Sequence, residues 1–595
     1  GTDTNPAMRK NIGTMADIIE PTAGRATVPR GAISAQFRQA ITPTRIVSLL
    51  LAAVLLFLVA NPLFQLVKES FSNPRTGALT FANYVAAFAR PRYVQAFFNS
   101  VQLASYVALV AGAIGVPLAW AVSRSNMPLR NLVHGMVIVS FLVPPFVGAI
   151  GWILLGGPNA GWINRTYMWI TGASAGPFNI FSVPGLVLVI SLYVFPLVYV
   201  FTKSALDLVS TEMEEAAAIL GSGPVSTTFR ITLPLVLPSI LGSLFIVFLE
   251  VLGLYGTAAL IAIPAGFNVV TTQLAAFFEN PVRVEVAAAF SMPLVGITIA
   301  LIGLQRLVLA RKGYVTVGGK GGHRTPMDLG AFRWVMLGYA GFIGSLSVLL
   351  PVYIILQSAF SVAWVKGLTP GNLTLHNFYL ALVGQPSIRQ SLFNTFNYAF
   401  WAATISTALG FAIAYISQRK LLPFASVLSG VTMAPFAVPG IVLAICFYAA
   451  YAPPPLSLYG LGVLIVIAFV TRFLPIAFVN SNSAIQGVHP ELEEAVRIAG
   501  GTQGRAIWQV VLPILKMSLL GSWLLVFVIG TRELSTAMFL SGPQTRVISV
   551  LTIEMSEQGQ YEILSAIAVL LLLITGIIVA VGTKIIGRDF MLRRT

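Results

Sequence analysis

Apolar runs of about 20 residues recur along the whole chain, and no other feature restricts its fold as strongly. A helix needs about 20 apolar residues to cross the hydrocarbon core of a bilayer. Inside lipid every backbone N–H and C=O must be satisfied within the protein, so spanning segments are helices or the strands of a closed barrel. The alternating segments of about ten residues that a barrel requires do not occur. We therefore expect an all-α polytopic membrane protein.

The composition agrees with a membrane protein. Of the 595 residues, 56% are hydrophobic and 9% are charged, whereas soluble domains carry about 25% charged residues. The formal net charge of +16 would suggest nucleic acid in a soluble protein. Here basic residues at the ends of apolar runs explain it better, so we expect a lipid membrane and no nucleic acid as a partner. The single cysteine, Cys446, lies in an apolar run and excludes an internal disulfide.

The apolar runs predict twelve spanning helices, preceded by a polar cytosolic tail over residues 1–43. The spans cover residues 44–66, 97–123, 132–156, 183–203, 239–262, 284–309, 333–359, 393–417, 422–450, 460–481, 517–539 and 562–585. If the N-terminus is inside, 25 of the 36 Lys and Arg residues fall in segments on the inner side. Basic residues concentrate on the cytoplasmic side of membrane proteins, so we expect both termini in the cytoplasm.

The sequence repeats itself. Glu215 and Glu494, Gly221 and Gly500, and Pro234 and Pro513 are each 279 residues apart, and Asn99 and Asn394 are 295 apart, as are Gly115 and Gly410. Each repeat contains six spans and enters the membrane in the same direction, which indicates parallel repeats. We predict two homologous six-helix halves, 44–310 and 333–595, joined by a cytosolic linker at 311–332.

The linker contains a sequence that resembles a phosphate-binding loop but does not meet its requirements. The P-loop pattern needs a first Gly where this chain has Tyr314, and Ser or Thr where it has Gly321. We therefore expect no ATP hydrolysis by this chain, and no enzymatic activity of its own.

Two matched polar loops, at about 204–238 and 482–516, interrupt the apolar pattern. In the first, "EEAAAIL" favours a helix with acids in its first turn, where the helix dipole stabilises negative charge. Gly221 and the Pro224 that follows end that helix. We expect a second helix after the turn, lying near the membrane surface, and small residues Ala216 and Ala217 that allow a partner to approach closely.

This pattern resembles the EAA loop of type I ABC importer permeases. Glu215, Ala216, Ala217, Gly221 and Pro234 match it in the first copy. The second copy matches with Glu494, Ala495, Gly500 and Pro513, and has Val496 in place of the second Ala. The resemblance extends over nearly the whole chain beyond the tail.

The resemblance implies the type I ABC importer permease fold and a set of partners. In that family the loop docks on a separate ATP-binding subunit, and its Glu makes a polar contact there. We therefore expect two copies of a cytosolic ATP-binding subunit that hold ATP and Mg²⁺, no cofactor in this chain, and a periplasmic substrate-binding protein. The expected location is the bacterial inner membrane.

Within the family, the fused two-half arrangement resembles the ferric-iron uptake group. The stretches "TRFLPIAFVNSNSAIQGVHPELEEAVRIAG" and "TRELSTAMFLSGPQTRVISVLTIE" of the second half carry this resemblance. The first half lacks the acidic-aromatic-Gly run of iron permeases after its fifth span. Ferric iron is therefore the first expected substrate, with polyamines, thiamine, phosphonates and sugar phosphates as alternatives.

Four ionisable residues stand out within predicted spans: Glu250 in the fifth, Arg472 in the tenth, and Arg532 and Glu533 in the eleventh. Such residues are costly in a membrane and suggest function. They either line the substrate pathway or brace neighbouring helices. Prolines at 144, 145, 435 and 439 predict kinks in the third and ninth spans. No cluster of metal ligands occurs in the sequence.

Two alternatives remain from the sequence alone. A proton-coupled secondary transporter can also have twelve helices in parallel halves, but it gives no reason for two matched cytoplasmic loops. A membrane scaffold without transport activity is the other alternative.

Overall fold

The structure is a computed structural model that describes residues 43–209, 212–279, 281–311 and 326–586. One compact unit spans Leu51–Thr595, and every contact reported below lies within it. Almost all of the tail predicted over 1–43, and most of the linker predicted over 311–332, lie outside the described residues.

Ten helical segments of the described chain are long and apolar enough to cross a membrane, and there are twelve spans if each of two bent pairs counts as one. The first half contributes the run α2 (Pro43–Leu55), η1 (Leu56–Ala60) and α3 (Asn61–Ser70), then α5 (Pro91–Arg124), α9 (Val183–Leu208), the run α11 (Pro224–Thr227), η2 (Thr228–Thr232) and α12 (Leu233–Gly253), and α14 (Val284–Arg311). The second half contributes the run α15 (Phe332–Gly344), η4 (Ser345–Leu349) and α16 (Leu350–Ala359), then α18 (Pro386–Gln418), α21 (Gly462–Gln486), the run α23 (Gln503–Ala506), η9 (Ile507–Val511) and α24 (Leu512–Thr531), and α26 (Tyr561–Ile586).

The third and ninth predicted spans are bent pairs rather than continuous helices. In the first half α6 (Arg130–Leu142) meets α7 (Pro145–Gly156) at 97°, and in the second half α19 (Ala425–Met433), extended by the 3₁₀ turn η8 (Ala434–Ala437), meets α20 (Gly440–Tyr451) at 112°. The breaks fall at the predicted prolines, which cannot continue the helical hydrogen-bond ladder. The predicted kinks in the third and ninth spans are therefore confirmed.

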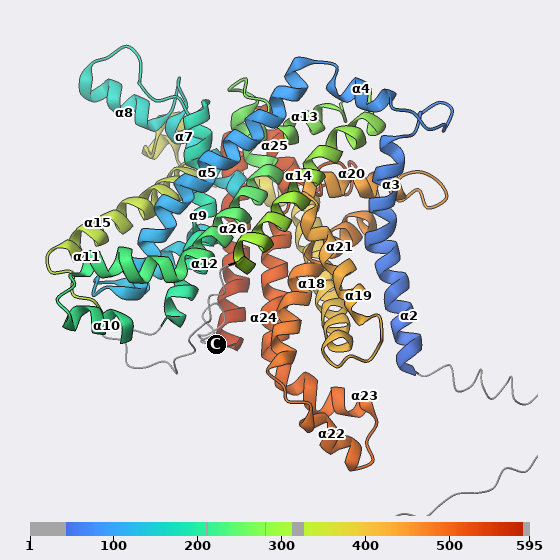
Figure 1. Ribbon diagram of the computed structural model, residues 1–595. Helices are drawn as coiled ribbons and strands as arrows, with labels where there is room; N and C mark the ends of the chain where they lie inside the picture. Colours follow the sequence, from blue (N-terminus) through green and yellow to red (C-terminus); the bar gives the residue numbers. More distant parts are fainter. Residues whose placement is uncertain (1–42, 210–211, 280, 312–325, 587–595) are drawn as a thin grey trace, which may run out of the picture. The chain divides into compact units, whose positions relative to one another are not determined.

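Shorter elements connect the spans, and they differ in part between the two halves (Figure 1). In the first half they are α4 (Ala82–Phe88), α8 (Trp162–Thr171), α10 (Glu212–Ile219), η3 (Ala258–Ala262) and α13 (Val270–Ala276). In the second half they are η5 (Trp364–Lys366), η6 (Pro370–Asn372), α17 (His376–Tyr379), η7 (Leu380–Gly384), α22 (Glu491–Ile498) and α25 (Ile548–Glu557). The spans themselves recur in the same order, because in each half two long helical runs are followed by a bent pair and three further runs, and this confirms the internal repeat.

Four of the spanning runs contain one wide π-helical turn, and each turn is followed two residues later by a proline. These prolines are Pro62, Pro234, Pro351 and Pro513. Proline lacks an N–H and its ring clashes with the carbonyl one turn earlier, so a locally wider turn lets the helix continue. Pro234 and Pro513 are the prolines of the two matched loops. The helix that follows each loop is therefore continuous with the spanning helix.

Two matched glycines allow close packing at the centre of each half. A Cβ at Gly115 in α5 would lie 3.0 Å from the backbone oxygen of Phe195 in α9, and a Cβ at Gly410 in α18 would lie 2.8 Å from the backbone nitrogen of Phe478 in α21. Small residues at such positions let membrane helices approach until their backbones touch. The helix pairs α5–α9 and α18–α21 form the most extensive contacts of the fold.

The halves exchange their first helices. In the first half, α3 packs against α20 of the second half, while α16 packs against α7 of the first. Thr471 donates a hydrogen bond of 3.2 Å to the backbone oxygen of Leu58, and the Tyr451 hydroxyl donates one to that of Phe57. Both bent pairs are thus held between elements of the two repeats.

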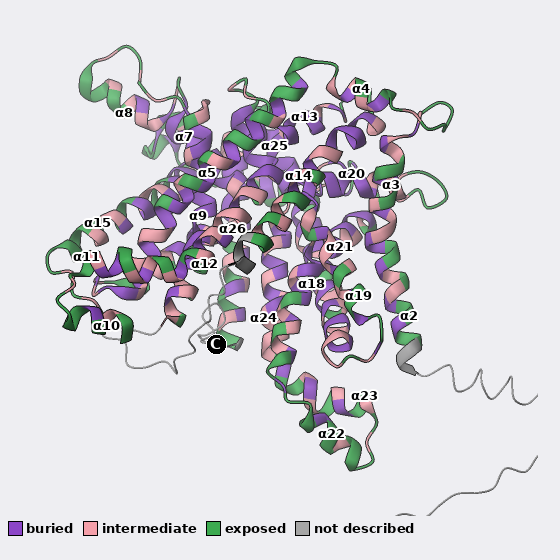
Figure 2. Ribbon diagram, viewed as in Figure 1, coloured by how far each residue is buried: buried purple, intermediate pink, exposed green. Residues whose placement is uncertain are grey.

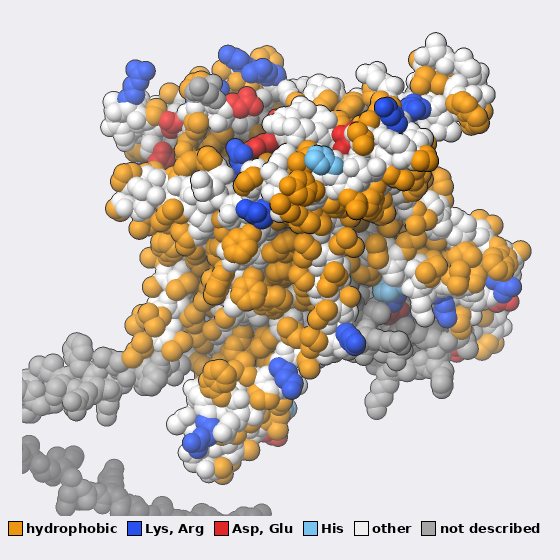
Figure 3. Space-filling view, turned by 180° about the vertical axis from the view of Figure 1, so that it is seen from behind, with side chains coloured by type: hydrophobic (Ala, Val, Ile, Leu, Met, Phe, Trp, Pro, Cys, Tyr) orange, Lys and Arg blue, Asp and Glu red, His pale blue; other side chains and the backbone are white. Residues whose placement is uncertain are grey.

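The surface is that of a membrane protein. Figure 3 shows hydrophobic side chains over the broad middle of one face, with Lys, Arg, Asp and Glu gathered toward its upper and lower margins. Figure 2 shows buried residues concentrated where the long helices meet, and exposed residues on α10, α11, α22 and α23. The two matched loops lie at the lower end of the view in Figure 1.

Candidate functional site

The two matched loops have the same local structure. The helices α10 and α22 each carry three glutamates in the first turn, where the unpaired N–H groups of a helix favour negative charge. Gly221 and Gly500 follow these helices with φ of +83° and +82°. The next residues, Ser222 and Gly501, donate to the carbonyls of Ala217 and Val496 at 2.9 and 2.8 Å. Glycine ends each helix because it adopts the left-handed conformation without a steric penalty.

The predicted docking residues mostly face outward. Glu215, Ala216 and Gly221 are exposed in the first loop, and so are Glu494, Ala495 and Gly500 in the second. Ala217, in contrast, is 8% exposed and packs against its own chain. Of the two predicted small residues on α10, Ala216 is the one that faces outward.

Both loops also present matched apolar side chains to the surroundings. Ile219 and Ile498 are 86% and 88% exposed, and Phe229 and Trp508 are 67% and 74% exposed. Met213 and Leu492 form a third exposed pair. Each pair is 279 residues apart, in the register of the repeat. Large apolar side chains gathered on one exposed surface are typical of protein interaction sites.

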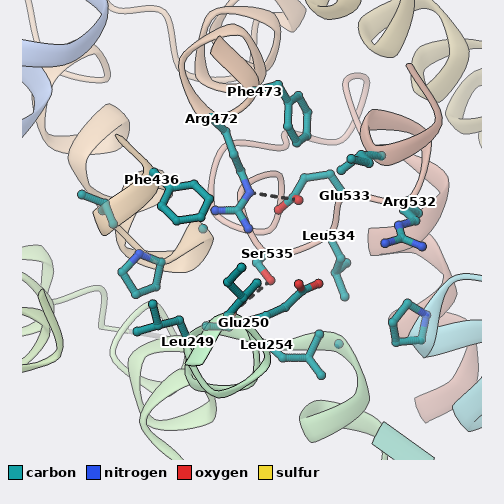
Figure 4. A pocket seen from close by; sticks show the side chains of 18 of the residues that line it. Leu249, Glu250, Leu254, Phe436, Arg472, Phe473, Arg532, Glu533, Leu534 and Ser535 are labelled. Carbon is teal, nitrogen blue, oxygen red and sulfur yellow. Dashed lines mark hydrogen bonds and ion pairs between the residues drawn. The ribbon is translucent and has the colours of Figure 1, made fainter. Parts of the chain in front are cut away.

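A second site is a cavity of about 300 Å³ between the halves, lined mostly by apolar side chains together with a few charged and hydroxyl groups. It lies where both bent pairs break and where α12 and α24 end, and it includes Pro145 of the first pair and Pro439 of the second. The four ionisable residues singled out from the predicted spans all line this one cavity: Glu250, Arg472, Arg532 and Glu533 (Figure 4).

Two of these charges pair with each other. Nε of Arg472 lies 3.1 Å from Oε2 of Glu533. The other carboxylate oxygen of Glu533 accepts hydrogen bonds from the backbone N–H and hydroxyl of Thr536, both at 2.9 Å. Gly440 makes room for the guanidinium, because a Cβ there would lie 2.8 Å from Cζ of Arg472. This pair braces α21 against the segment that follows α24.

The other two charges differ in their surroundings. Arg532 donates a hydrogen bond to the backbone oxygen of Phe141 and lies over its ring. Glu250 is exposed to the cavity and makes no hydrogen bond or ion pair within the part of the chain that the structure describes. Arg472, Arg532 and Glu533 are thus held by hydrogen bonds or an ion pair, whereas Glu250 faces the cavity.

The polar lining is not symmetric. The residues 279 positions before Arg472 and Glu533 are Tyr193 and Leu254. Tyr193 is 3% exposed, and a Cβ at Gly148 would lie 2.0 Å from its ring. An aromatic and an aliphatic side chain in the first half thus occupy the places of the ion pair in the second.

Sequence reasoning missed four charged residues beside the loops. Arg124 pairs with Glu214, and Arg419 pairs with Glu493. The signal was present in the repeat, because the arginines are 295 residues apart and the glutamates 279 apart, which are the two repeat distances already noted.

Together these features define a membrane transport subunit built from two fused repeats, with a cavity that contains charged side chains between them and one exposed loop on each. The sequence profile of the family described as binding-protein-dependent transport system inner membrane component matches residues 112–314 and 410–591. The chain belongs to this family. It is a type I ABC importer permease with two fused halves and a multi-pass protein of the inner membrane.

Named relatives agree with this assignment. The ferric transport system permease protein FbpB of Actinobacillus pleuropneumoniae is 27% identical over 561 residues, or 91% of this chain and 78% of that protein. The Fe(3+)-transport system permease protein FbpB 2 of Haemophilus influenzae is 22% identical over 82% of this chain and 89% of that protein. The molybdenum transport system permease protein ModB of Escherichia coli is 29% identical and covers 35% of this chain and 90% of its own length.

Proposed function

We propose that this chain is the membrane subunit of an ATP-driven importer whose ATPase is a separate cytosolic subunit. The observation that carries the proposal is the matched pair of exposed loops around α10 and α22, each with an acidic first turn and a left-handed glycine. Docking on them would cover the exposed Ile, Phe and Trp side chains that both loops present. ATP and Mg²⁺ are bound by the docked subunits.

Two copies of the same ATP-binding subunit fit these loops. Three exposed apolar side chains recur at equivalent positions, including Ile219 with Ile498 and Phe229 with Trp508. One partner surface, used twice, is the simplest reason for this recurrence. Glu215 and Glu494, exposed at equivalent positions of α10 and α22, are the proposed polar contacts.

In this arrangement the loops and both termini lie in the cytoplasm, in agreement with the concentration of Lys and Arg on that side. A periplasmic binding protein delivers substrate to the opposite end. The cavity between the halves is the proposed pathway, which opens by alternating access to the two sides. The family membership removes the support for a proton-coupled secondary transporter and for a scaffold.

Ferric iron is the proposed substrate. Relatives named as ferric transport permeases align along 91% and 82% of this chain, whereas the relative named for molybdenum aligns along 35%. The carboxylate of Glu250 offers a transient contact for a cation in the cavity. The chain itself need not bind the substrate strongly, because selection by a binding protein precedes entry.

The test is reconstitution of the full chain with its ATP-binding subunit and binding protein in proteoliposomes. We expect two ATP-binding subunits for each chain and ATP-dependent uptake of ferric iron, both lost when Glu215 and Glu494 are changed to alanine. If no ATP-binding subunit co-purifies with the unmodified chain, or if uptake proceeds without ATP, the proposal is wrong. Uptake of molybdate instead of ferric iron would overturn the substrate alone.

A further inference from the structure

A buried arginine connects the first docking loop to the rest of its half. Nη1 of Arg124, the last residue of α5, lies 3.2 Å from Oε2 of Glu214 in α10. Its Nη2 donates to the backbone oxygens of Leu206 and Val209 at the end of α9, the second at 2.8 Å. Oε1 of Glu214 accepts a hydrogen bond of 2.6 Å from the hydroxyl of Thr232, where the next span begins. One ion pair therefore joins α5, α9, α10 and the start of α12.

The second half contains the same arrangement. Nη2 of Arg419, directly after α18, lies 2.6 Å from Oε1 of Glu493 in α22, and its Nε donates to that oxygen at 2.7 Å. Nη2 also donates to the backbone oxygen of Val488 at 3.0 Å. The hydroxyl of Tyr415 donates to Oε2 of Glu493 at 2.5 Å, which is the place that Thr232 takes in the first half.

The correspondence extends to the carbonyl acceptors, because Val209 and Val488 are 279 residues apart, as are the two glutamates. The four charged side chains are between 3% and 13% exposed. The hydroxyl group that donates to the glutamate differs between the halves. The two arrangements therefore share the ion pair and the carbonyl acceptor at the end of the fourth span of each half.

Stability alone does not explain two such pairs. Taking both charges out of water costs about as much as their attraction returns, and well-packed apolar residues often replace buried ion pairs without loss. What a charged pair with several fixed hydrogen bonds provides is one defined geometry, because each donor and acceptor has a required direction. That geometry fixes the position of α10 relative to α5 in the first half, and of α22 relative to α18 in the second.

We propose that the Arg124–Glu214 and Arg419–Glu493 pairs are the joints through which movement of the docked subunits reaches the spanning helices. The inference rests on the proposed function. Each glutamate directly precedes the exposed glutamate proposed to contact the ATP-binding subunit, Glu215 or Glu494. A displacement of α10 or α22 is therefore passed through the neighbouring residue to α5 and α9, or to α18 and α21. These residues position the loop and do not touch ATP or substrate.

The test uses the full complex in proteoliposomes and the double variant Glu214→Gln with Glu493→Gln. Glutamine keeps the size of glutamate and can still accept hydrogen bonds, but it has no charge to hold the arginine. We expect the ATP-binding subunits to co-purify as before, and substrate uptake per ATP hydrolysed to fall at least about fivefold, at the lower end of typical coupling between sites.

The control is Glu554→Gln, which removes the charge from another Arg–Glu pair, with Arg546 at 3.1 Å, remote from the docking loops. Uptake per ATP should not change in it. A variant with apolar pairs, Arg124→Met with Glu214→Leu and Arg419→Met with Glu493→Leu, covers the case in which the glutamine variant does not fold. It should fold, because apolar replacement of both partners leaves no buried charge, and it should lose coupling in the same way.

The outcomes separate the two proposals. If the unmodified chain captures no ATP-binding subunit, the proposed function fails, and the joint fails with it. If the unmodified complex transports and a folded variant keeps its uptake per ATP within about twofold, far less than typical coupling, the joint is wrong and the proposed function stands. A change in melting temperature with unchanged uptake per ATP would likewise reduce the pairs to structural braces.

Discussion

Arg532 of the second half donates a hydrogen bond to the backbone oxygen of Phe141 in the first half, and its guanidinium carbon lies 4.4 Å from the centre of the Phe141 ring. The contact reaches the last turn of α6, immediately before the break at Pro144. It joins the two halves at the wall of the central cavity. A change in the cavity that separates the halves must therefore break or move this contact.

Changing Arg532 to alanine should weaken the contact between the halves at the wall of the cavity. The variant loses a charge-assisted hydrogen bond, which contributes about 2 kcal/mol, and the cation–π contact with Phe141. We expect a lower melting temperature for the purified protein and reduced uptake of ferric iron in proteoliposomes.

Arg165→Ala is the matched control, since Arg165 also bonds from the first half to a backbone oxygen of the second, that of Val365, but outside the cavity. Its uptake should stay near that of the unmodified chain. Equal loss of uptake in both variants would show that contacts between the halves matter in general, and that Arg532 has no special place at the cavity.

The ion pair of Arg472 and Glu533 can be tested with the residues that the first half places there. Glu533→Leu alone leaves the arginine without its partner in a mostly buried place, and should lower the free energy of unfolding by about 3 kcal/mol. Adding Arg472→Tyr reproduces the Tyr193 and Leu254 arrangement of the first half and should recover most of that loss.

Thermal unfolding of both single variants and the double variant gives the interaction energy directly. If the double variant is as unstable as the sum of the singles, the pair contributes no specific interaction. The uptake activity of a stable double variant then shows whether charge at this wall of the cavity is needed for transport.

The helical fold and the repeat could be predicted from the sequence because both depend on local patterns. Runs of apolar residues define spans, and the recurrence of Gly221 at Gly500 defines the repeat. The prolines located the breaks of the two bent pairs, but their bends of 97° and 112° depend on what packs there. Here α16 packs on α7 and α3 packs on α20, and such exchanged packing has no local signal.

The residues of the candidate site could be predicted from the sequence, but the contacts between them could not. No partner for Arg472 could be predicted from the sequence, although Glu533 was recognised as another charge within a span. The partner of Arg124 lies 90 residues away in the chain, and only the fold brings them together. Ala217 belongs to the loop pattern, but the face that α10 buries is decided by its packing. The sequence held one further signal, because the charged residues of these pairs recur in both halves at the two repeat distances.

The left-handed glycines of the docking loops give a prediction with a close control. Nothing lies within 4 Å of a Cβ built at Gly221, Gly500 or Gly266, and all three have positive φ. Valine at any of them costs about 1–2 kcal/mol of backbone strain. At Gly221 and Gly500, valine also places a branched side chain on the proposed docking surface.

We therefore expect Gly221→Val with Gly500→Val to reduce co-purification of the ATP-binding subunit and ATP-driven uptake, and Gly266→Val to leave both nearly unchanged. The measurement is the yield of ATP-binding subunit for each chain after purification. Equal yields from the three proteins would mean that the loops do not approach a partner at these glycines.

The exposed apolar side chains test whether the two loops bind the same partner. Phe229→Ser and Trp508→Ser should leave the melting temperature of the isolated chain unchanged, because both side chains are already largely exposed. Large aromatic side chains at the centre of an interface contribute about 2 kcal/mol or more to binding. Each single change should therefore weaken capture of the ATP-binding subunit at its own loop by roughly 30-fold, leaving about one subunit per chain, and the double change should remove both.

Native mass spectrometry of the purified complexes gives the number of subunits directly. If one single variant loses both subunits, the subunits bind as a preformed pair. If only one of the two single variants loses a subunit, the two loops are not equivalent docking sites.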